Sequence, residues 1–311
     1  MNSKKIALTI IFLWLSACAG PKIARVEPPA VMPPPREIEN VQVALVLGGG
    51  GAKGIAHLGV LEVLERHNIP LDLIVGTSAG SVVGAMYADY RDSKLLFDNL
   101  IKLQKWDLLD FSFLDTLYFF SDLRAPIQGY YMEDFVIKNL TVHNMEDLSI
   151  PFVAVATDLE NESAFSISSG PIATAVHASS AIPPFFRPVQ AYGKLLVDGG
   201  VIEPVPVFSA LKYNPKMIIA VDISTSGREY VKPNMWDVTL RSMYISYYKL
   251  SQWQSHQADI LIHPDCTGVG LFDDEHKQHL YNLGRNAAEK LIPEIVAKMK
   301  EKGISTKNVI M

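Results

Sequence analysis

The hydrophobic pattern of the chain alternates short β-rich runs with helical segments. The runs VQVALVL at 41–47 and LDLIVG at 71–76 are typical of buried strands, and further strands are predicted at 152–159, 194–200, 217–224 and 259–264. Between the first two strands, Ile55, Leu58, Leu61 and Leu64 recur at helical spacing, and a terminal helix is predicted over 275–301. We therefore predict an α/β fold with a mostly parallel central sheet flanked by helices on both faces.

The N-terminal residues follow a different pattern. Lys4 and Lys5 precede an apolar run over 6–15, which is too short to span a bilayer and is typical of a secretion signal. The letters LSAC at 15–18 resemble the lipobox of bacterial lipoproteins, in which the chain is cut before the cysteine that carries the lipid. This resemblance implies a signal peptide over 1–17, a lipidated Cys18, and, with Ala19 next, an outer-membrane location in the cell envelope. An ordinary secretory signal is the alternative.

Six prolines between Pro21 and Pro35 favour an extended tether over 18–40, so the folded domain is predicted to occupy 41–311. The composition agrees with a folded domain of this size. With 49% apolar residues the chain can bury a substantial core, and a formal net charge of −5 without a dense basic patch argues against a nucleic-acid partner. The sequence leaves the oligomeric state open.

Four consecutive glycines, Gly48 to Gly51, follow the first strand, and the segment LVLGGGGAKG allows three uses. A phosphate-binding P-loop fails on the letters around Lys53. A dinucleotide fingerprint fits Gly49, Gly51 and Gly54, with Asp72 further along the chain. The third use is an oxyanion hole, in which the N–H groups of Gly50 and Gly51 point at a developing negative charge.

Two further motifs help to decide between these three uses of the glycine loop. GTSAG at 76–80 matches G-x-S-x-G between a strand and a helix, where Gly76 and Gly80 leave room for a sharp turn that exposes Ser78. VDGG at 197–200 places Asp198 at the end of a strand, followed by Gly199 and Gly200. Taken singly, each motif also fits an ordinary glycine-rich turn.

In the order GGGGAKG, GTSAG and DGG, these motifs resemble those of the patatin-like phospholipase family, and HASSAIPPFFRPV at 177–189 resembles the segment ahead of that family's aspartate. The resemblance covers residues 41–207. It implies a three-layer fold and a Ser78–Asp198 dyad without a histidine. It also implies oxyanion donors at Gly50 and Gly51 in a loop shaped by Gly49 and Gly54, with Gly76, Gly80, Gly199 and Gly200 as supporting positions. The implied activity is hydrolysis of lipid acyl esters without a metal or other cofactor.

The sequence leaves several alternative functions and residue roles open. A nucleotide-binding module would use the glycine loop for pyrophosphate, and an α/β-hydrolase would add His263 to Ser78 and Asp198 as a triad. His57 is expected to be a packing or surface histidine. Lys53 is interpreted either as an exposed charge near a helix start or as a contact for a phospholipid head group. The aromatic segment at 106–120 either packs on the core or contacts lipid.

Overall fold

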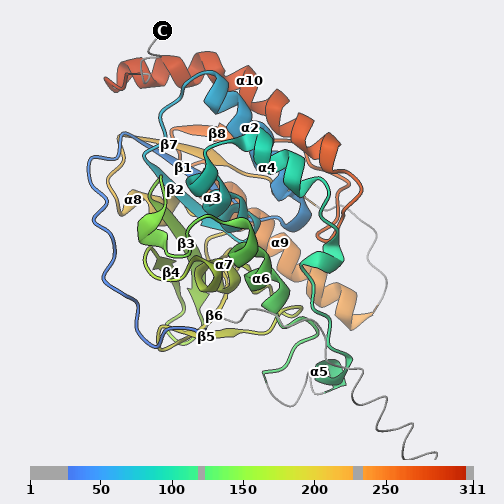
Figure 1. Ribbon diagram of the computed structural model, residues 1–311. Coiled ribbons are helices and arrows are strands. Elements are labelled where there is room, and N and C mark those ends of the chain that lie inside the picture. The colour runs from blue at the N-terminus through green and yellow to red at the C-terminus, as the bar shows by residue number, and fades with distance from the viewer. Residues whose placement is uncertain (1–26, 118–122, 227–233, 306–311) are drawn as a thin grey trace, which may run out of the picture.

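The computed structural model of the chain describes residues 27–117, 123–226 and 234–305 (Figure 1). The predicted signal peptide over 1–17, Cys18 and residues 118–120 of the aromatic segment lie outside the described residues. Within the described part, one sheet lies between two layers of helices, as the sequence predicts.

The sheet has the strand order β5-β6-β3-β2-β1-β7-β8, with β4 paired to β3. The strands are β1 (Val43–Leu47), β2 (Leu73–Thr77), β3 (Phe152–Asp158), β4 (Ser163–Ile167), β5 (Val189–Ala191), β6 (Lys194–Asp198), β7 (Met217–Val221) and β8 (Ile260–Ile262). The five strands from β3 to β8 in this order run parallel, whereas β4, β5 and β6 form an antiparallel edge. The predicted fold class is therefore confirmed.

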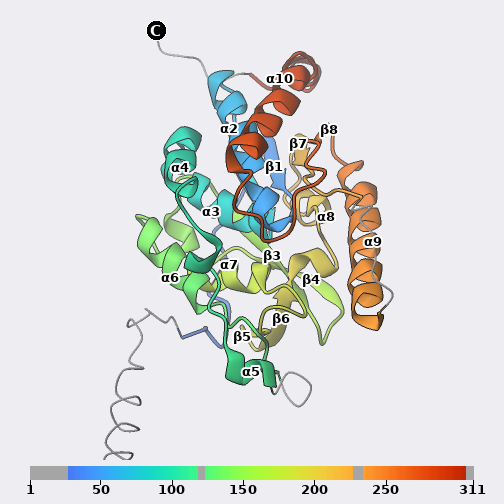
Figure 2. The same cartoon turned by 90° about the vertical axis from the view of Figure 1, so that its right-hand side faces the viewer.

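The α-helices divide into two layers. They are α2 (Ile55–Arg66), α3 (Ala79–Tyr90), α4 (Ser93–Leu100), α5 (Phe113–Leu117), α6 (Tyr130–Asn139), α7 (Ile172–Ser180), α8 (Val207–Leu211), α9 (Met235–Ser255) and α10 (Lys277–Glu301). In Figure 2, α4 and α6 lie on one side of the molecule, and α9 lies on the other, with the sheet between them. Short 3-10 turns follow β1 at Gly51–Gly54 and β6 at Gly199–Val201.

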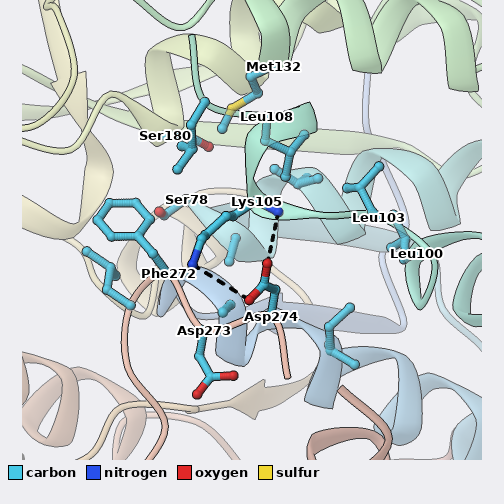
Figure 3. Close-up of a pocket in the computed structure, with 18 of the residues that line it drawn as sticks. Ser78, Leu100, Leu103, Lys105, Leu108, Met132, Ser180, Phe272, Asp273 and Asp274 are labelled. Atoms are coloured by element: carbon cyan, nitrogen blue, oxygen red, sulfur yellow. Dashed lines mark hydrogen bonds and ion pairs between the residues drawn. The ribbon is translucent and has the colours of Figure 1, made fainter. Parts of the chain in front are cut away.

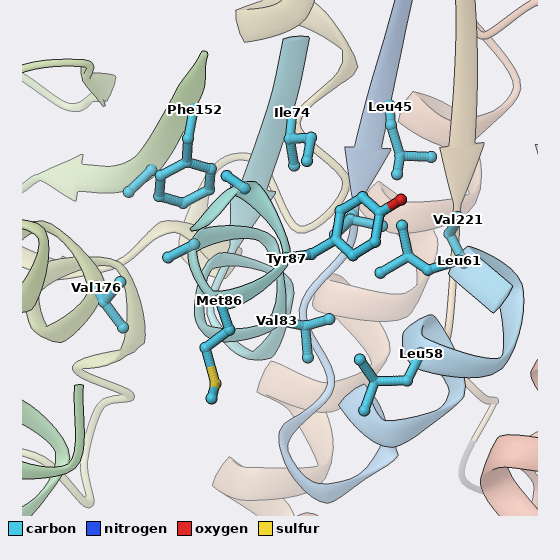
Figure 4. Packing of buried hydrophobic residues seen from close by; sticks show 14 of the residues in the cluster. Leu45, Leu58, Leu61, Ile74, Val83, Met86, Tyr87, Phe152, Val176 and Val221 are labelled. Carbon is cyan, nitrogen blue, oxygen red and sulfur yellow. The ribbon is translucent and has the colours of Figure 1, made fainter. Parts of the chain in front are cut away.

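Each central strand divides its side chains between two hydrophobic clusters. In β1, Leu45 and Leu47 join the larger cluster, which packs against α2, α3, α4, α7 and α10 (Figure 4), whereas Val46 joins the smaller cluster beneath α8. Successive residues of a strand point to opposite faces, so a strand covered on both faces is apolar at nearly every position. This is why the sequence predicts the central strands β1, β2 and β3, which are buried at every position.

The pattern did not predict β4, β5, α4, α5, α6, α7, α8 or α9. The largest omission is α9, whose 21 residues include only Ser251, Gln254 and Ser255 as buried positions. All three are polar, so the helix carries no apolar periodicity that a sequence would reveal.

Residues 27–40 run along the surface without a helix or a strand. Ser169 donates a hydrogen bond to the carbonyl of Pro33 at 2.6 Å, and the backbone N–H of Tyr192 donates to the carbonyl of Pro29 at 2.6 Å. In the part of the chain that the structure describes, no helix has the length and apolar character needed to cross a membrane.

Candidate functional site

Ser78 lies on the sharp turn between β2 and α3. Its backbone has φ 54° and ψ −123°, a conformation that L-residues rarely adopt, and its side chain does not cap the helix. A side-chain carbon at Gly76 would lie 2.4 Å from the carbonyl oxygen of Gly80, and one at Gly80 would lie 2.1 Å from that of Leu47. Strand, turn and helix can therefore meet this closely only with glycine at both positions.

The end of α7 holds this turn in place. The backbone N–H of Ser78 faces both the carbonyl oxygen and the hydroxyl of Ser179, at 3.1 and 3.0 Å. Ser179 in turn donates its hydroxyl hydrogen to the carbonyl of Val155 in β3 at 2.7 Å. Two residues further on, the carbonyl of Ala181 accepts a hydrogen bond from the N–H of Asp198 at 2.9 Å. One short segment thus fixes the backbones of both Ser78 and Asp198.

The sheet register brings Asp198 beside Ser78. Thr77, just before Ser78, pairs with Val155, and the next residue of β3, Ala156, pairs with Asp198 in β6. Ser78 and Asp198 therefore flank β3 at the same level. Gly199 is required by this arrangement, because a side-chain carbon there would lie 2.2 Å from the carbonyl oxygen of Val155.

The carboxyl group of Asp198 is buried, not solvated. Its Oδ1 accepts a hydrogen bond from the N–H of Gly200 at 2.6 Å, whereas Oδ2 has no hydrogen-bond partner among the described residues. Burial raises the pKa of Asp198 to about 6, and the nearby hydroxyl of Ser78 and the N–H of Gly200 oppose this rise. A carboxylate in this state is a stronger base than a solvated aspartate.

The glycine loop adjoins Ser78. A side-chain carbon at Gly49 would lie 3.0 Å from Cβ of Ser78, and one at Gly54 would lie 2.8 Å from Cβ of Ala79. The N–H of Gly49 donates to the carbonyl of Pro204 at 2.9 Å. Those of Gly50 and Gly51 make no hydrogen bond to another backbone group among the described residues. Of the loop donors that the sequence singles out, these two are therefore available to a ligand.

An apolar pocket opens beside Ser78 (Figure 3). It lies between α3, the segment 100–109, α6 and the loop 271–274, and its lining includes Ser78, Val82, Val83, Leu100, Leu103, Leu108, Met132, Phe135, Ser180 and Phe272. Lys105 and Asp274 also line it, and Nζ of Lys105 lies 3.8 Å from Oδ1 of Asp274. An apolar pocket with few polar groups, placed next to a hydroxyl, suits a flexible hydrocarbon chain.

The aromatic segment packs on the core only in part. Trp106, Phe111 and Phe113 are 61%, 59% and 68% exposed, so the core interpretation is wrong for these three residues. Leu108 and Leu109 of the same segment pack against the larger hydrophobic cluster and also line the pocket. The aromatic composition singled out this segment. Composition alone does not show whether an aromatic side chain is buried in the core or exposed beside a pocket.

Lys53 is buried, with 1% of its surface exposed, so its interpretation as an exposed charge is wrong. Its Nζ donates to the hydroxyl of Thr225 at 3.1 Å and to that of Tyr244 at 3.4 Å, and it lies 5.7 Å from the centre of the Tyr244 ring. Thr225 follows β7 and Tyr244 belongs to α9, so elements remote in the sequence enclose this side chain.

His57, His177 and His263 all make contacts outside the Ser78–Asp198 pair. Nε2 of His57 contacts the carbonyl of Gly48 at 2.8 Å, and burial lowers its pKa to about 4. Nδ1 of His177 contacts Glu133 at 2.8 Å. Nδ1 of His263 contacts the carbonyl of Asp222 at 2.7 Å, at the end of β8, and β1 and β7 separate that strand from β2. A triad through His263 does not form.

The nucleotide reading also lacks its acidic partner. Oδ2 of Asp72 accepts hydrogen bonds from the N–H groups of Gln42 and Val43, at 3.0 Å each, just before β1. The glycine loop lies at the opposite end of that strand. Asp72 therefore joins the starts of β1 and β2 and cannot face a ribose bound at the loop.

Tyr247 on α9 is a site residue that the sequence did not reveal. A side-chain carbon at Gly49 would lie 2.8 Å from its hydroxyl oxygen, and one at Gly200 would lie 2.6 Å from its ring. The hydroxyl is buried and has no hydrogen-bond partner within the described ranges. No motif surrounds Tyr247, and the helix that carries it was itself not predicted.

Fold and site together define an α/β protein in which Ser78 lies on a strained strand-to-helix turn. The buried Asp198 lies beside this serine, and the glycine loop after β1 contacts it. The sequence pattern of the patatin-like phospholipases matches residues 45–211, more than half of the chain, and the chain belongs to that family. The predicted family membership is confirmed.

Individual relatives agree with this assignment. Lysophospholipase NTE1 of Scheffersomyces stipitis is 29% identical over an alignment of 288 positions, which covers 82% of this chain and 18% of that protein. Patatin-like phospholipase domain-containing protein 6 of Mus musculus is 30% identical over an alignment of 242 positions, which covers 75% of this chain and 17% of that protein. The chain thus spans less than a fifth of the length of either relative. The crystal structure of VipD from Legionella pneumophila shares the fold, with a TM-score of 0.51 and 16% identity over 90% of this chain and 73% of that one.

Proposed function

We propose that the chain is a serine hydrolase that cleaves acyl esters of lipids, with Ser78 as the nucleophile and Asp198 as the base. The observation that carries this proposal is the register of β2, β3 and β6, which sets a buried carboxylate beside a serine on a strained turn, next to an apolar pocket. The membership of the chain in the patatin-like phospholipase family supports the same reaction.

In the first step, Asp198 accepts the proton of Ser78 while Oγ attacks the ester carbonyl carbon. The carbonyl oxygen becomes an oxyanion facing the N–H groups of Gly50 and Gly51, and removal of one such donor costs about 3 kcal/mol in related chemistry. The alcohol part of the lipid leaves with the proton from Asp198, and the acyl group stays on Ser78 as an ester. Water then hydrolyses this acyl-enzyme, with Asp198 again as the base.

We propose a lysophospholipid as the substrate class, because the pocket beside Ser78 is a single apolar space that suits one acyl chain. The name of the Scheffersomyces stipitis relative, a lysophospholipase, agrees with this choice. We further propose that Cys18 carries a lipid that attaches the domain to the cell envelope of a bacterium, at the outer membrane. The LSAC motif supports this attachment, and the prolines over 21–35 would act as a spacer.

Replacement of each dyad residue tests the reaction. Ser78→Ala is expected to abolish both labelling by a fluorophosphonate probe and release of palmitate from 1-palmitoyl lysophosphatidylcholine. Asp198→Asn is expected to lower kcat/KM about a thousandfold, a loss of about 4 kcal/mol in transition-state stabilisation.

His263→Ala provides the matched control, because a triad needs this histidine and a dyad does not. We expect it to stay within about tenfold of the wild-type kcat/KM, whereas loss of a triad base costs several orders of magnitude. Wild-type turnover by a folded Ser78→Ala protein would refute the proposed function, and a thousandfold loss in a folded His263→Ala protein would replace the dyad by a triad.

A further inference from the structure

The ring of Tyr247 fills a space that two motif glycines leave open. A side-chain carbon at Gly200 would lie 2.6 Å from Cε2 of Tyr247 and 2.8 Å from Oδ1 of Asp198. A side-chain carbon at Gly49 would lie 2.8 Å from the hydroxyl oxygen of Tyr247 and 3.0 Å from Cβ of Ser78. Tyr247 therefore borders Asp198 on one side and Ser78 on the other, and neither glycine tolerates a larger residue without displacing it.

Two buried polar atoms in this space lack a partner in the described part of the chain. One is Oδ2 of Asp198, an acceptor, and the other is the hydroxyl of Tyr247, which can donate. Buried polar groups are hydrogen-bonded in most native proteins. In the resting site the hydroxyl of Ser78 lies near the Asp198 carboxylate, and acylation of Ser78 removes that hydroxyl. In the acyl-enzyme, a reacting molecule can therefore join Oδ2 of Asp198 to the hydroxyl of Tyr247. The neighbouring Tyr244 differs, because its hydroxyl accepts a hydrogen bond from Lys53.

The phenol keeps its proton at neutral pH. Burial and the nearby carboxylates of Asp198 and Asp222 raise the pKa of Tyr247 well above its ordinary value. The hydroxyl is thus a hydrogen-bond donor at neutral pH, where Asp198 is ionised.

We propose that Tyr247 holds the water molecule that hydrolyses the acyl-enzyme, an inference that rests on the proposed function. The water oxygen accepts a hydrogen bond from the Tyr247 hydroxyl, and one water O–H donates to Oδ2 of Asp198. The remaining lone pair then faces the acyl carbonyl carbon. As the oxygen attacks, Asp198 takes the proton, the bond between that carbon and Oγ of Ser78 breaks, and Oγ recovers the proton from Asp198.

This role is specific to the second half of the reaction. Attack by Ser78 requires no water, so acylation should proceed without the phenol hydroxyl, whereas deacylation should slow. When deacylation slows in an acyl-enzyme mechanism, kcat and KM fall by the same factor and kcat/KM is preserved, because kcat/KM reports the steps up to acylation. A residue that merely supports the site would lower kcat/KM instead.

The test is Tyr247→Phe, which deletes the hydroxyl and keeps the ring. Because the hydroxyl makes no hydrogen bond to any residue that the structure describes, its removal leaves no buried group there newly unsatisfied, and the variant should fold. With a p-nitrophenyl acyl ester, we expect kcat to fall about tenfold to thirtyfold, kcat/KM and the rate of fluorophosphonate labelling to stay within about threefold, and a burst of about one p-nitrophenol per site to appear.

Tyr248→Phe is the matched control, because Tyr248 lies on the same helix and its hydroxyl contacts Gln252 at 2.9 Å. We expect it to leave all three quantities unchanged. An unchanged kcat in Tyr247→Phe would overturn the inference, and so would a joint fall of kcat/KM, labelling and kcat. Neither result bears on the proposed Ser78–Asp198 dyad. That proposal is refuted only if a folded Ser78→Ala protein keeps its turnover.

Discussion

At the scale of single residues, the site depends on groups held in states that they would not adopt in water or in an unfolded chain. Ser78 has a positive φ, and Asp198 is buried with a raised pKa. The pKa of Asp198 rises from 3.8 to about 6 on folding, so the folded state loses stability relative to the unfolded chain as the pH rises through this window. The proposed reactivity of Ser78 is thus obtained at a cost in stability.

The raised pKa predicts a particular pH profile. Asp198 must be ionised to accept the proton of Ser78, so kcat/KM should fall as the pH decreases, with its half-maximal value near pH 6. A water-soluble short-chain ester measured over a pH series would report this value. An acid limb near pH 4 would indicate that the active carboxylate is solvated, which would contradict the role assigned to this buried group.

At the scale of elements, the site gathers turns that lie at one end of the sheet. The glycine loop follows β1, Ser78 follows β2, and Asp198 ends β6, which runs antiparallel to β3. Helix α7 joins them through Ser179, and α9 adds Tyr247 from the face opposite the large core. Small loops between parallel strands and helices commonly carry function in this way, because the sheet holds their ends rigidly.

The pocket between these elements should select the acyl chain. Leu108 lines the pocket and is partly exposed, so Leu108→Trp should narrow the pocket. We expect hydrolysis of a palmitoyl ester to fall about tenfold or more, a loss of about 1.4 kcal/mol or more, while that of a butyryl ester stays within about threefold. Comparison of kcat/KM for the two esters measures this selectivity.

Leu95→Trp is the control for this prediction, because Leu95 is exposed on α4 and does not line the pocket. It should leave the ratio of palmitoyl to butyryl hydrolysis unchanged. An unchanged ratio in Leu108→Trp as well would place the acyl chain elsewhere.

At the scale of the whole molecule, the proposed anchor and the domain should be separable. Cys18→Ser is expected to abolish incorporation of labelled palmitate and to release the protein from membranes on expression in a bacterium, while hydrolysis of the short-chain ester persists. The reason is that stable attachment requires more than one acyl chain, which the cysteine would supply. Unchanged partitioning into the membrane fraction would contradict the lipobox interpretation.

Much of the fold and of the site can be predicted because the signals are local. A strand buried on both faces must be apolar at nearly every position, and residues 43–47, 73–77 and 217–221 satisfy this requirement. The turn at Ser78 needs glycine at positions 76 and 80, because a Cβ there would overlap backbone atoms. The five residues of the GTSAG motif are therefore enough to predict this turn. Steric rules of this kind act between residues close in sequence, and the motifs that they produce identify the family.

Other features depend on contacts between distant segments and could not be predicted in this way. The closeness of Asp198 to Ser78 results from the pairing of β6 with β3, Lys53 is enclosed by Thr225 and Tyr244, and Asp72 is used at the far end of β1. Tyr247 reaches the site on a helix whose buried positions are polar and therefore give no periodic signal. The sequence by itself thus determined the central strands, the glycine turns and Ser78 as the proposed nucleophile. Only the tertiary structure decided which side chains surround that nucleophile, because burial and hydrogen bonding depend on neighbours that no local pattern specifies.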